Sequence, residues 1–146
     1  MVSKKDEEII EILQSDARLP VSEIARKIGM SENGVRYRLE KLENSGYIQS
    51  FTVLLNPKKF GRNVTAIFNI NTTPKKTTDV IHRLQEMDEL QVIYKTSGVY
   101  SLMIIGLFRS IDELNVFIEE KLADADIIES TVDVVTKKLK ETQFSI

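Results

Sequence analysis

The chain has 146 residues and no cysteine, with 42% hydrophobic residues, 29% charged residues and a formal net charge of −2. This composition is that of an ordinary globular protein, and the lack of cysteine excludes disulfides and thiolate metal sites. The sequence shows no apolar signal region at its start and no apolar run long enough to span a membrane, so we expect a cytoplasmic protein.

The first predicted element is a helix from about Lys4 to Gln14. Ser3 before the helix and Asp6 in its first turn have the spacing of a capping arrangement. Its expected buried side consists of apolar residues, namely Ile9, Ile10, Ile12 and Leu13. Its outward side chains are acidic, and phosphate repels such a surface. We therefore expect this helix to support the elements that follow it and not to contact nucleic acid.

The stretch from Arg18 to Tyr47 has the pattern of a helix-turn-helix. Its first helix carries an apolar stripe at spacings of three and four, formed by Val21, Ile24, Ala25 and Ile28. Gly29 begins a tight turn, Ser31 is a good N-cap for the second helix, and Gly46 supplies the stop. The second helix should bury Val35, Leu39 and Leu42. Its other side is then free to enter a major groove.

The predicted DNA-contacting residues are the polar positions that this arrangement exposes, namely Ser22, Ser31, Glu32, Asn33, Arg36, Tyr37, Arg38 and Lys41. Asn33 can pair with adenine, and Arg36 or Arg38 with guanine or phosphate. The two serines lie at helix N-termini, where hydroxyl and backbone N–H groups suit phosphate. Two alternatives stay open: Arg38 can instead bridge helices within the domain, and Tyr37 can flank the core.

The net charge hides a basic zone in this part of the chain. Between Arg18 and Arg62 there are nine basic residues against four acidic ones, a local charge of +5. Phosphate contact requires a local basic surface, whatever the net charge of the chain. A solvated face of mixed charge is the alternative interpretation.

After Tyr47 the pattern changes. Residues 51–55 predict a short strand, so a connecting strand and basic linker over 51–63 should join a domain at 1–50 to a domain at 64–146. The second domain alternates between period-two and helical patterns, with strands predicted at 64–71, 91–96, 100–108 and 127–139. Helices opened by Thr73 and by a Ser110–Glu113 capping box complete a βαββαβ, ferredoxin-like order, and the fold class is α+β.

The predicted strand at 102–108 is apolar on both faces. A sheet of this order covers only one face with its own helices, so we expect another subunit to bury the other face. The alternative is a central strand that simply carries no polar residue.

In their order and spacing these motifs resemble the Lrp/AsnC family, the leucine-responsive and feast/famine transcriptional regulators of bacteria and archaea, and the resemblance is archaeal-like. It covers essentially the whole chain and is carried by Ser22–Ala25, Gly29–Ser31, Val35–Leu39, Leu42–Glu43, Gly46–Ile48 and Thr96–Tyr100. It implies a winged-helix-like DNA-binding domain and a C-terminal amino-acid-sensing domain of the RAM or ACT type. It also implies a homodimer, assembled further into tetramers or octamers, that binds double-stranded DNA.

The resemblance further implies an amino acid or similar effector bound near the turn between the second and third strands of the second domain. The implied effector-binding residues are Gly98, Val99, Tyr100, Ser101 and Leu102, with Ser130, Thr131 and Val132 from a neighbouring chain. Many family members have aspartate where this chain has Ser101, and a hydroxyl residue where it has Val132. Because a hydroxyl offers only neutral hydrogen bonds, Ser101 favours a neutral polar effector such as glutamine.

No cofactor, metal site or catalytic constellation is expected, since His82 is the only histidine and the adjacent acidic pairs point in different directions on helices. Gly29 and Gly34 have the spacing that opens a P-loop, but the Lys-Ser/Thr pair is missing. The sequence therefore predicts a ligand-responsive transcriptional regulator and no enzyme. The alternatives are an architectural protein that wraps DNA without an effector and a small-molecule-binding ferredoxin-like protein.

Overall fold

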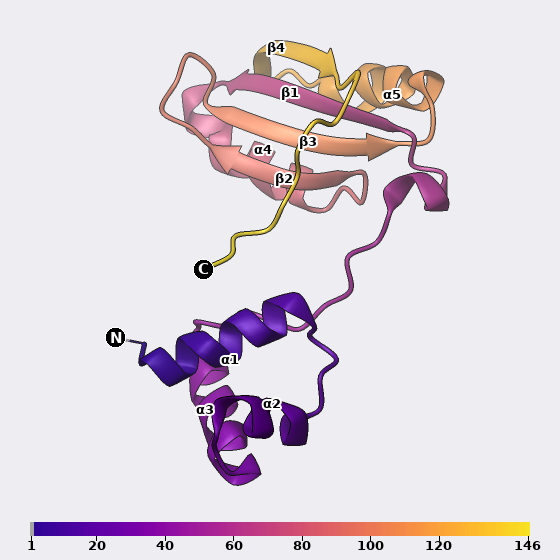
Figure 1. Ribbon diagram of the computed structural model, residues 1–146. Helices are drawn as coiled ribbons and strands as arrows, with labels where there is room; N and C mark the ends of the chain where they lie inside the picture. The colour runs from indigo at the N-terminus through magenta and orange to yellow at the C-terminus, as the bar shows by residue number, and fades with distance from the viewer. Residues whose placement is uncertain (1) are drawn as a thin grey trace. The chain divides into compact units, whose positions relative to one another are not determined.

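The computed structural model describes residues 2–146, which form two compact units (Figure 1). The first unit comprises the residues up to Leu54 together with the tail Lys140–Ile146, and the second comprises Leu55–Leu139. These bounds differ from the predicted 1–50, 51–63 and 64–146. The tail groups with the first unit because the Gln14 side chain donates to the Phe144 carbonyl (2.9 Å) and accepts from the Ile146 N–H (3.3 Å).

The first unit contains three helices, α1 (Lys4–Ser15), α2 (Val21–Ile28) and α3 (Glu32–Asn44). The predicted capping arrangement at the start of α1 is present, with Ser3 and Asp6 bonding each other's backbone N–H groups. The apolar sides of the helices meet in a small core formed by Ile9, Ile24, Ala25, Ile28 and Val35. The helix-turn-helix read from the sequence is confirmed.

Two glycines end the helices of this motif. Gly29 follows α2 with φ of 67° and Gly46 follows α3 with φ of 76°, a left-handed backbone conformation that side chains with a Cβ rarely adopt. Between the helices Ser31 caps α3, because its Oγ accepts from the Gly34 N–H at 3.1 Å. The chain therefore turns sharply twice, and α3 is held between two defined ends.

The strand predicted at 51–55 is not formed. The segment is irregular, and its apolar side chains are exposed, from 50% at Phe51 to 77% at Val53. A strand forms only where its backbone groups pair with a neighbouring strand. Within residues 2–146 no strand pairs with this segment, so its β-forming residues remain without a sheet.

The second unit has the predicted βαββαβ order. Its elements are η1 (Pro57–Phe60), β1 (Val64–Thr72), η2 (Pro74–Lys76), α4 (Thr77–Gln85), β2 (Leu90–Lys95), β3 (Leu102–Phe108), α5 (Ile111–Phe117), the π-helical turn η3 (Ile118–Leu122) and β4 (Ile127–Val134). The four strands form one antiparallel sheet in the order β2-β3-β1-β4. This is the ferredoxin-like arrangement, and with the helical first unit the α+β prediction is confirmed.

Several element ends differ from the predicted ones. The third strand begins at Leu102 instead of residue 100, and the last ends at Val134 instead of residue 139. Its ladder stops there because Val134 pairs with Ala66, close to the start of β1. Ser110 caps α5 as predicted, but the Glu113 carboxylate accepts from the Arg109 N–H, not from that of Ser110.

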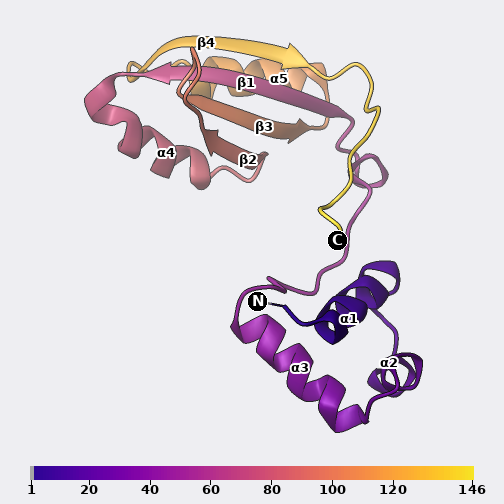
Figure 2. The same cartoon turned by 60° about the vertical axis from the view of Figure 1, so that its left-hand side comes forward.

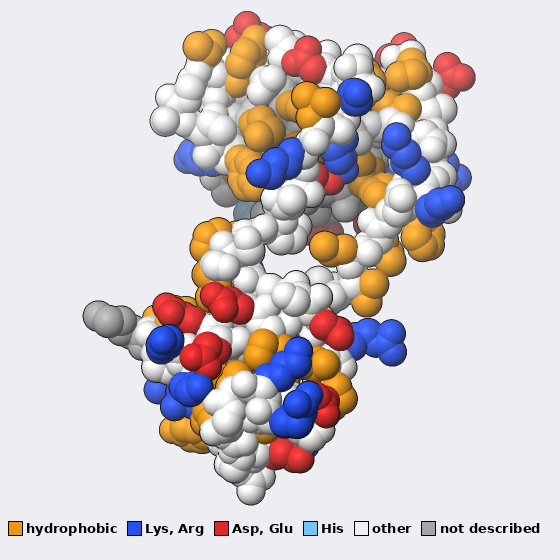
Figure 3. All heavy atoms as spheres, in the orientation of Figure 1, with side chains coloured by type: hydrophobic (Ala, Val, Ile, Leu, Met, Phe, Trp, Pro, Cys, Tyr) orange, Lys and Arg blue, Asp and Glu red, His pale blue; other side chains and the backbone are white. Residues whose placement is uncertain are grey.

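The two faces of the sheet differ in what covers them (Figure 2). Both helices pack on one face, where the core includes Phe68, Phe108 and Phe117 with ring centroids 5.1 to 6.0 Å apart. The other face carries partly exposed apolar side chains, namely Ile67, Met103, Ile105 and Leu107. We call these four residues the open-face cluster; hydrophobic side chains also reach the surface over β2 and β3 (Figure 3).

Within residues 2–146 no helix is both long and apolar enough to cross a membrane.

Candidate nucleic-acid interface and ligand site

The outward side of α3 presents a row of exposed polar residues. Val35 and Leu42 are buried and Leu39 packs partly against the core, so that the opposite side of the helix faces solvent. The predicted contact residues Glu32, Asn33, Arg36, Tyr37 and Lys41 are all exposed, as are Ser31 at the start of α3 and Ser22 on α2. The Arg36 side chain keeps 64% of its surface exposed and Tyr37 keeps 67%, so neither flanks the core.

Arg36 forms an ion pair with the Glu32 carboxylate one turn earlier, at 4.0 Å. An exposed pair at that distance contributes little free energy, because water solvates both groups. The donors of the Arg36 guanidinium are therefore available to a base edge or a phosphate.

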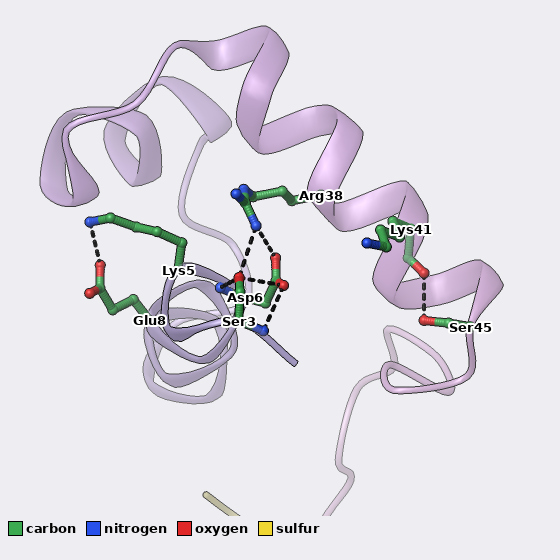
Figure 4. Close-up of polar contacts among 7 residues, drawn as sticks. All are labelled: Ser3, Lys5, Asp6, Glu8, Arg38, Lys41 and Ser45. Carbon is green, nitrogen blue, oxygen red and sulfur yellow. Dashed lines mark hydrogen bonds and ion pairs between the residues drawn. The ribbon is translucent and has the colours of Figure 1, made fainter. Parts of the chain in front are cut away.

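Arg38 lies differently, as Figure 4 shows. Its Nη1 donates to the Asp6 carboxylate at 2.7 Å and to Ser3 Oγ at 3.0 Å, both at the start of α1. Its side chain is 31% exposed and that of Asp6 only 10%. Of the two alternatives left open by the sequence, this geometry is that of the bridge between helices.

The Asp6 carboxyl is ionised within this contact. Burial raises its pKa, but hydrogen bonds from Ser3 and Arg38 and the charge of Arg38 outweigh that effect. They lower the pKa of Asp6 from its ordinary value of 3.8 to about 2. The contact is therefore a charge-assisted hydrogen bond across the whole physiological pH range.

The loop between β2 and β3, where the effector was expected, is tied down by Asn71 at the end of β1. Asn71 Nδ2 donates to the Val99 carbonyl (3.0 Å) and to the Glu129 carboxylate (3.2 Å), and its Oδ1 accepts from the Ser101 N–H (2.9 Å). The Tyr100 hydroxyl lies 3.5 Å from the other oxygen of Glu129. One amide thus holds the loop next to a carboxylate of β4 in the same chain.

The eight expected effector residues do not all face this loop. Gly98, Val99, Tyr100 and Ser101 lie together in it, and the Ser101 hydroxyl donates to the Ile70 carbonyl at 3.2 Å. Ser130 and Thr131 are exposed on β4, where Thr131 Oγ1 accepts from the Asn69 amide. The side chains of Leu102 and Val132 pack in the core under the helices, since strand residues alternate between faces.

Asn71 and Glu129 were missed from the sequence. Asn71 ends an alternating strand pattern, and Glu129 directly precedes the predicted Ser130. A polar amide near the end of a half-buried strand is the one local signal that pointed to a role for Asn71. Within residues 2–146 no group of three or more acidic or histidine side chains is placed to hold a metal ion.

Both units match known families. Residues 2–49 match the winged helix-turn-helix DNA-binding family, and residues 65–143 match the Lrp/AsnC ligand-binding domain. The chain is 35% identical over 141 residues to the HTH-type transcriptional regulator LrpA of Pyrococcus horikoshii, covering 96% of this chain and 100% of that protein.

The fold also matches solved structures across its length. AsnC of E. coli superposes with a TM-score of 0.94 at 26% identity, covering 99% of this chain and 98% of that one. A feast or famine regulatory protein from M. tuberculosis, complexed with L-methionine, superposes with a TM-score of 0.90 at 22% identity, covering 100% and 99%. The second likeness shows that the fold is shared.

Proposed function

Since this chain belongs to the Lrp/AsnC family of transcriptional regulators, we propose that α3 reads double-stranded DNA and that an amino acid bound in the second unit alters this binding. Members of this family are transcriptional regulators that combine a DNA-binding domain with an amino-acid-responsive domain. The named relatives are transcriptional regulators, which is a non-enzymatic role. The observation that carries the proposal is the exposed polar row on α3, opposite the buried Val35 and Leu42.

The proposed DNA face begins where α3 begins. Asn33 and Arg36 stand in its N-terminal half, which is the part of a recognition helix that meets base edges. The other proposed contacts serve bases or phosphate, namely Ser22, Ser31, Glu32, Tyr37 and Lys41. In a dimer, two such helices would enter successive major grooves about 34 Å apart on a near-palindromic site.

The DNA face is tested by Arg36→Ala in the full chain. We expect affinity for a duplex selected from a randomised pool to fall by roughly tenfold, since a good base contact contributes about 1–3 kcal/mol. The unfolding midpoint should stay unchanged, because the side chain is exposed. Arg109→Ala removes the same charge from an exposed position in the second unit and should leave affinity nearly unchanged. Equal affinities for the two variants in fluorescence anisotropy would reject this face.

A second copy of the chain is the proposed cover for the open-face cluster. An apolar sheet face that no helix of its own chain covers favours association. The exposed apolar segment 51–55, whose backbone has no strand to pair with in residues 2–146, supports the same conclusion. We infer a homodimer through these surfaces, with tetramers or octamers built from it.

For the effector we propose a neutral polar amino acid, such as glutamine, bound at the loop 98–101. The supporting geometry is the loop held beside Glu129 and the neutral hydroxyl of Ser101. The L-methionine complex of the M. tuberculosis relative supports an amino acid as the class of effector. The remaining proposed contacts are Leu102 through its backbone and Ser130, Thr131 and Val132, these three from a neighbouring chain.

A thermal-shift screen against the twenty amino acids tests the effector site. A ligand at 100 times its Kd should stabilise the native protein by roughly 2.7 kcal/mol, a shift of several degrees. Ser101→Ala should remove most of that shift, while Ser97→Ala, an exposed neighbour in the same segment, should keep it. No shift with any amino acid would reject the effector site, and an architectural DNA-wrapping role would then account better for the DNA face.

A further inference from the structure

The first turn of α1 contacts both helices of the helix-turn-helix, although α1 carries no proposed DNA contact. Lys5 Nζ donates to the Ile28 carbonyl at the end of α2 (2.8 Å). On the next residue, the Asp6 carboxylate accepts from Arg38 of α3 (2.7 Å, Figure 4). Two adjacent side chains therefore tie one helical turn to the elements before and after the turn of the motif.

The Asp6 contact is built to be rigid. The carboxylate accepts from the Ser3 N–H (3.0 Å), from the Ser3 hydroxyl (2.6 Å) and from Arg38. The same hydroxyl accepts from Arg38 at 3.0 Å, so the three residues form a closed network. Asp6 retains only 7% of its surface exposed. A buried carboxylate with every bond made holds its partner in one orientation, since any displacement leaves charge unpaired.

That orientation restricts the rotation of α3 about its axis, and the packing of Val35 in the core of the first unit acts in the same direction. Successive residues of an α-helix point about 100° apart, so holding Arg38 in place also sets the directions of Arg36 and Asn33. Reading a base requires two parallel hydrogen bonds, which a small rotation of the helix would misalign. A phosphate contact tolerates such a rotation better, because donors can reach a phosphate oxygen from several directions and the contact carries no sequence information.

We propose that Asp6 is a positioning residue for DNA readout, which through Arg38 sets the rotation of α3 and thereby the choice of bases. This inference rests on the proposed function of α3. A positioning residue and a residue that only stabilises the fold have different effects on DNA binding. Loss of stability lowers the folded fraction and weakens binding to every sequence alike, whereas a rotated recognition helix loses preference among sequences.

The positioning role also predicts the direction in which DNA affinity changes when the Asp6 carboxylate is removed. If Arg38 were instead a phosphate contact, Asp6 would compete with DNA for its guanidinium. Removing the carboxylate would then strengthen binding to all duplexes. A positioning role has the opposite consequence, because the arginine released from Asp6 no longer orients the helix.

The test uses the full chain and a duplex that the wild type selects from a randomised pool. Affinity is measured for this duplex and for versions with one base pair changed, with wild type, Asp6→Asn and the control Glu7→Gln, which removes the same charge from an exposed neighbour. All proteins are checked for full folding by circular dichroism at the assay temperature. We expect Asp6→Asn to reduce the discrimination between duplexes by roughly fivefold or more, and Glu7→Gln to preserve it.

Ser3→Ala serves if Asp6→Asn does not fold. It removes the hydroxyl bridge but leaves the ion pair, and discrimination should fall in the same direction by a smaller factor. Unchanged discrimination in a folded variant would overturn the positioning role, as would tighter binding to all duplexes. Arg36→Ala in the same assay separates the two ideas. If Arg36→Ala does not weaken binding, the proposed DNA face is wrong. If Arg36→Ala weakens binding but Asp6→Asn discriminates between duplexes as the wild type does, only the positioning role is wrong.

Discussion

The two units hold their proposed functional residues in place by different means. In the first, the proposed DNA contacts stand on α3 opposite a small apolar core, and the polar network of Asp6 and Arg38 adds to the hold on that helix. In the second, a larger core with three Phe rings fixes the sheet, while the loop proposed to bind the effector lies outside it and is held by hydrogen bonds of Asn71, Thr96 and Ser101. The proposed DNA face is therefore fixed by a core and a partly buried ion pair, whereas the proposed effector loop is held by hydrogen bonds near the surface.

Removing a ring from the core of the second unit should produce the largest effect. Phe68 is fully buried against Phe108 and Phe117, so Phe68→Ala should destabilise the second unit by about 3–5 kcal/mol. Phe144→Ala makes the same change at a side chain that is 86% exposed and should cost almost nothing. Urea unfolding followed by circular dichroism measures both. Similar losses for the two variants would show that the ring cluster does not hold the sheet.

A charge on the open-face cluster should have an intermediate effect, on assembly. Ile105→Glu places an unpaired carboxylate in the proposed interface. Because burying even a neutral polar group without a partner costs about 1–3 kcal/mol and a charge costs more, the dimer should weaken by roughly tenfold or more. Val116→Glu adds the same charge on the helical side, at a residue 49% exposed, and should leave the dimer intact. Sedimentation equilibrium gives both dissociation constants. A dimer that survives Ile105→Glu must use another surface.

The polar network of the first unit should have the smallest effect on stability, and one that depends on pH. Since the pKa of Asp6 is lowered to about 2 in the folded state, its contribution is complete above about pH 4 and is lost as the pH falls toward 2. We expect about 1 kcal/mol, below the full value of the shift because water reaches the Arg38 side chain. The difference in unfolding free energy between wild type and Asp6→Asn should therefore shrink between pH 4 and pH 2. A difference that stays constant over that range would mean that the carboxylate charge is not what stabilises the contact.

Features that depend on neighbouring residues in the chain could be predicted from the sequence. The caps at Ser3 and Ser31, the turns at Gly29 and Gly46 and the alternation in β1 depend on neighbours within a few residues, and all were predicted. The segment 51–55 has the residues of a strand but no strand to pair with in residues 2–146.

Contacts between residues far apart in the sequence could not be predicted, because they leave no local pattern. Asn71 meets Glu129 across 58 positions, and although the position of Asn71 in its strand pointed to a role, no local pattern identifies Glu129 as its partner. Arg38 stayed ambiguous because a guanidinium is satisfied equally by a carboxylate and by a phosphate, and only the fold brings Asp6 within 2.7 Å of it.

The most direct test of the central claim is the affinity of the full chain for its selected duplex, measured by anisotropy with and without each of the twenty amino acids. If an amino acid bound at the loop 98–101 alters the DNA face, one or a few amino acids should change that affinity by roughly 5- to 150-fold, the usual size of an allosteric coupling. The same ligands should have no such effect on Ser101→Ala. An affinity that is the same with every amino acid would contradict the account and leave a DNA-binding protein without an amino-acid effector.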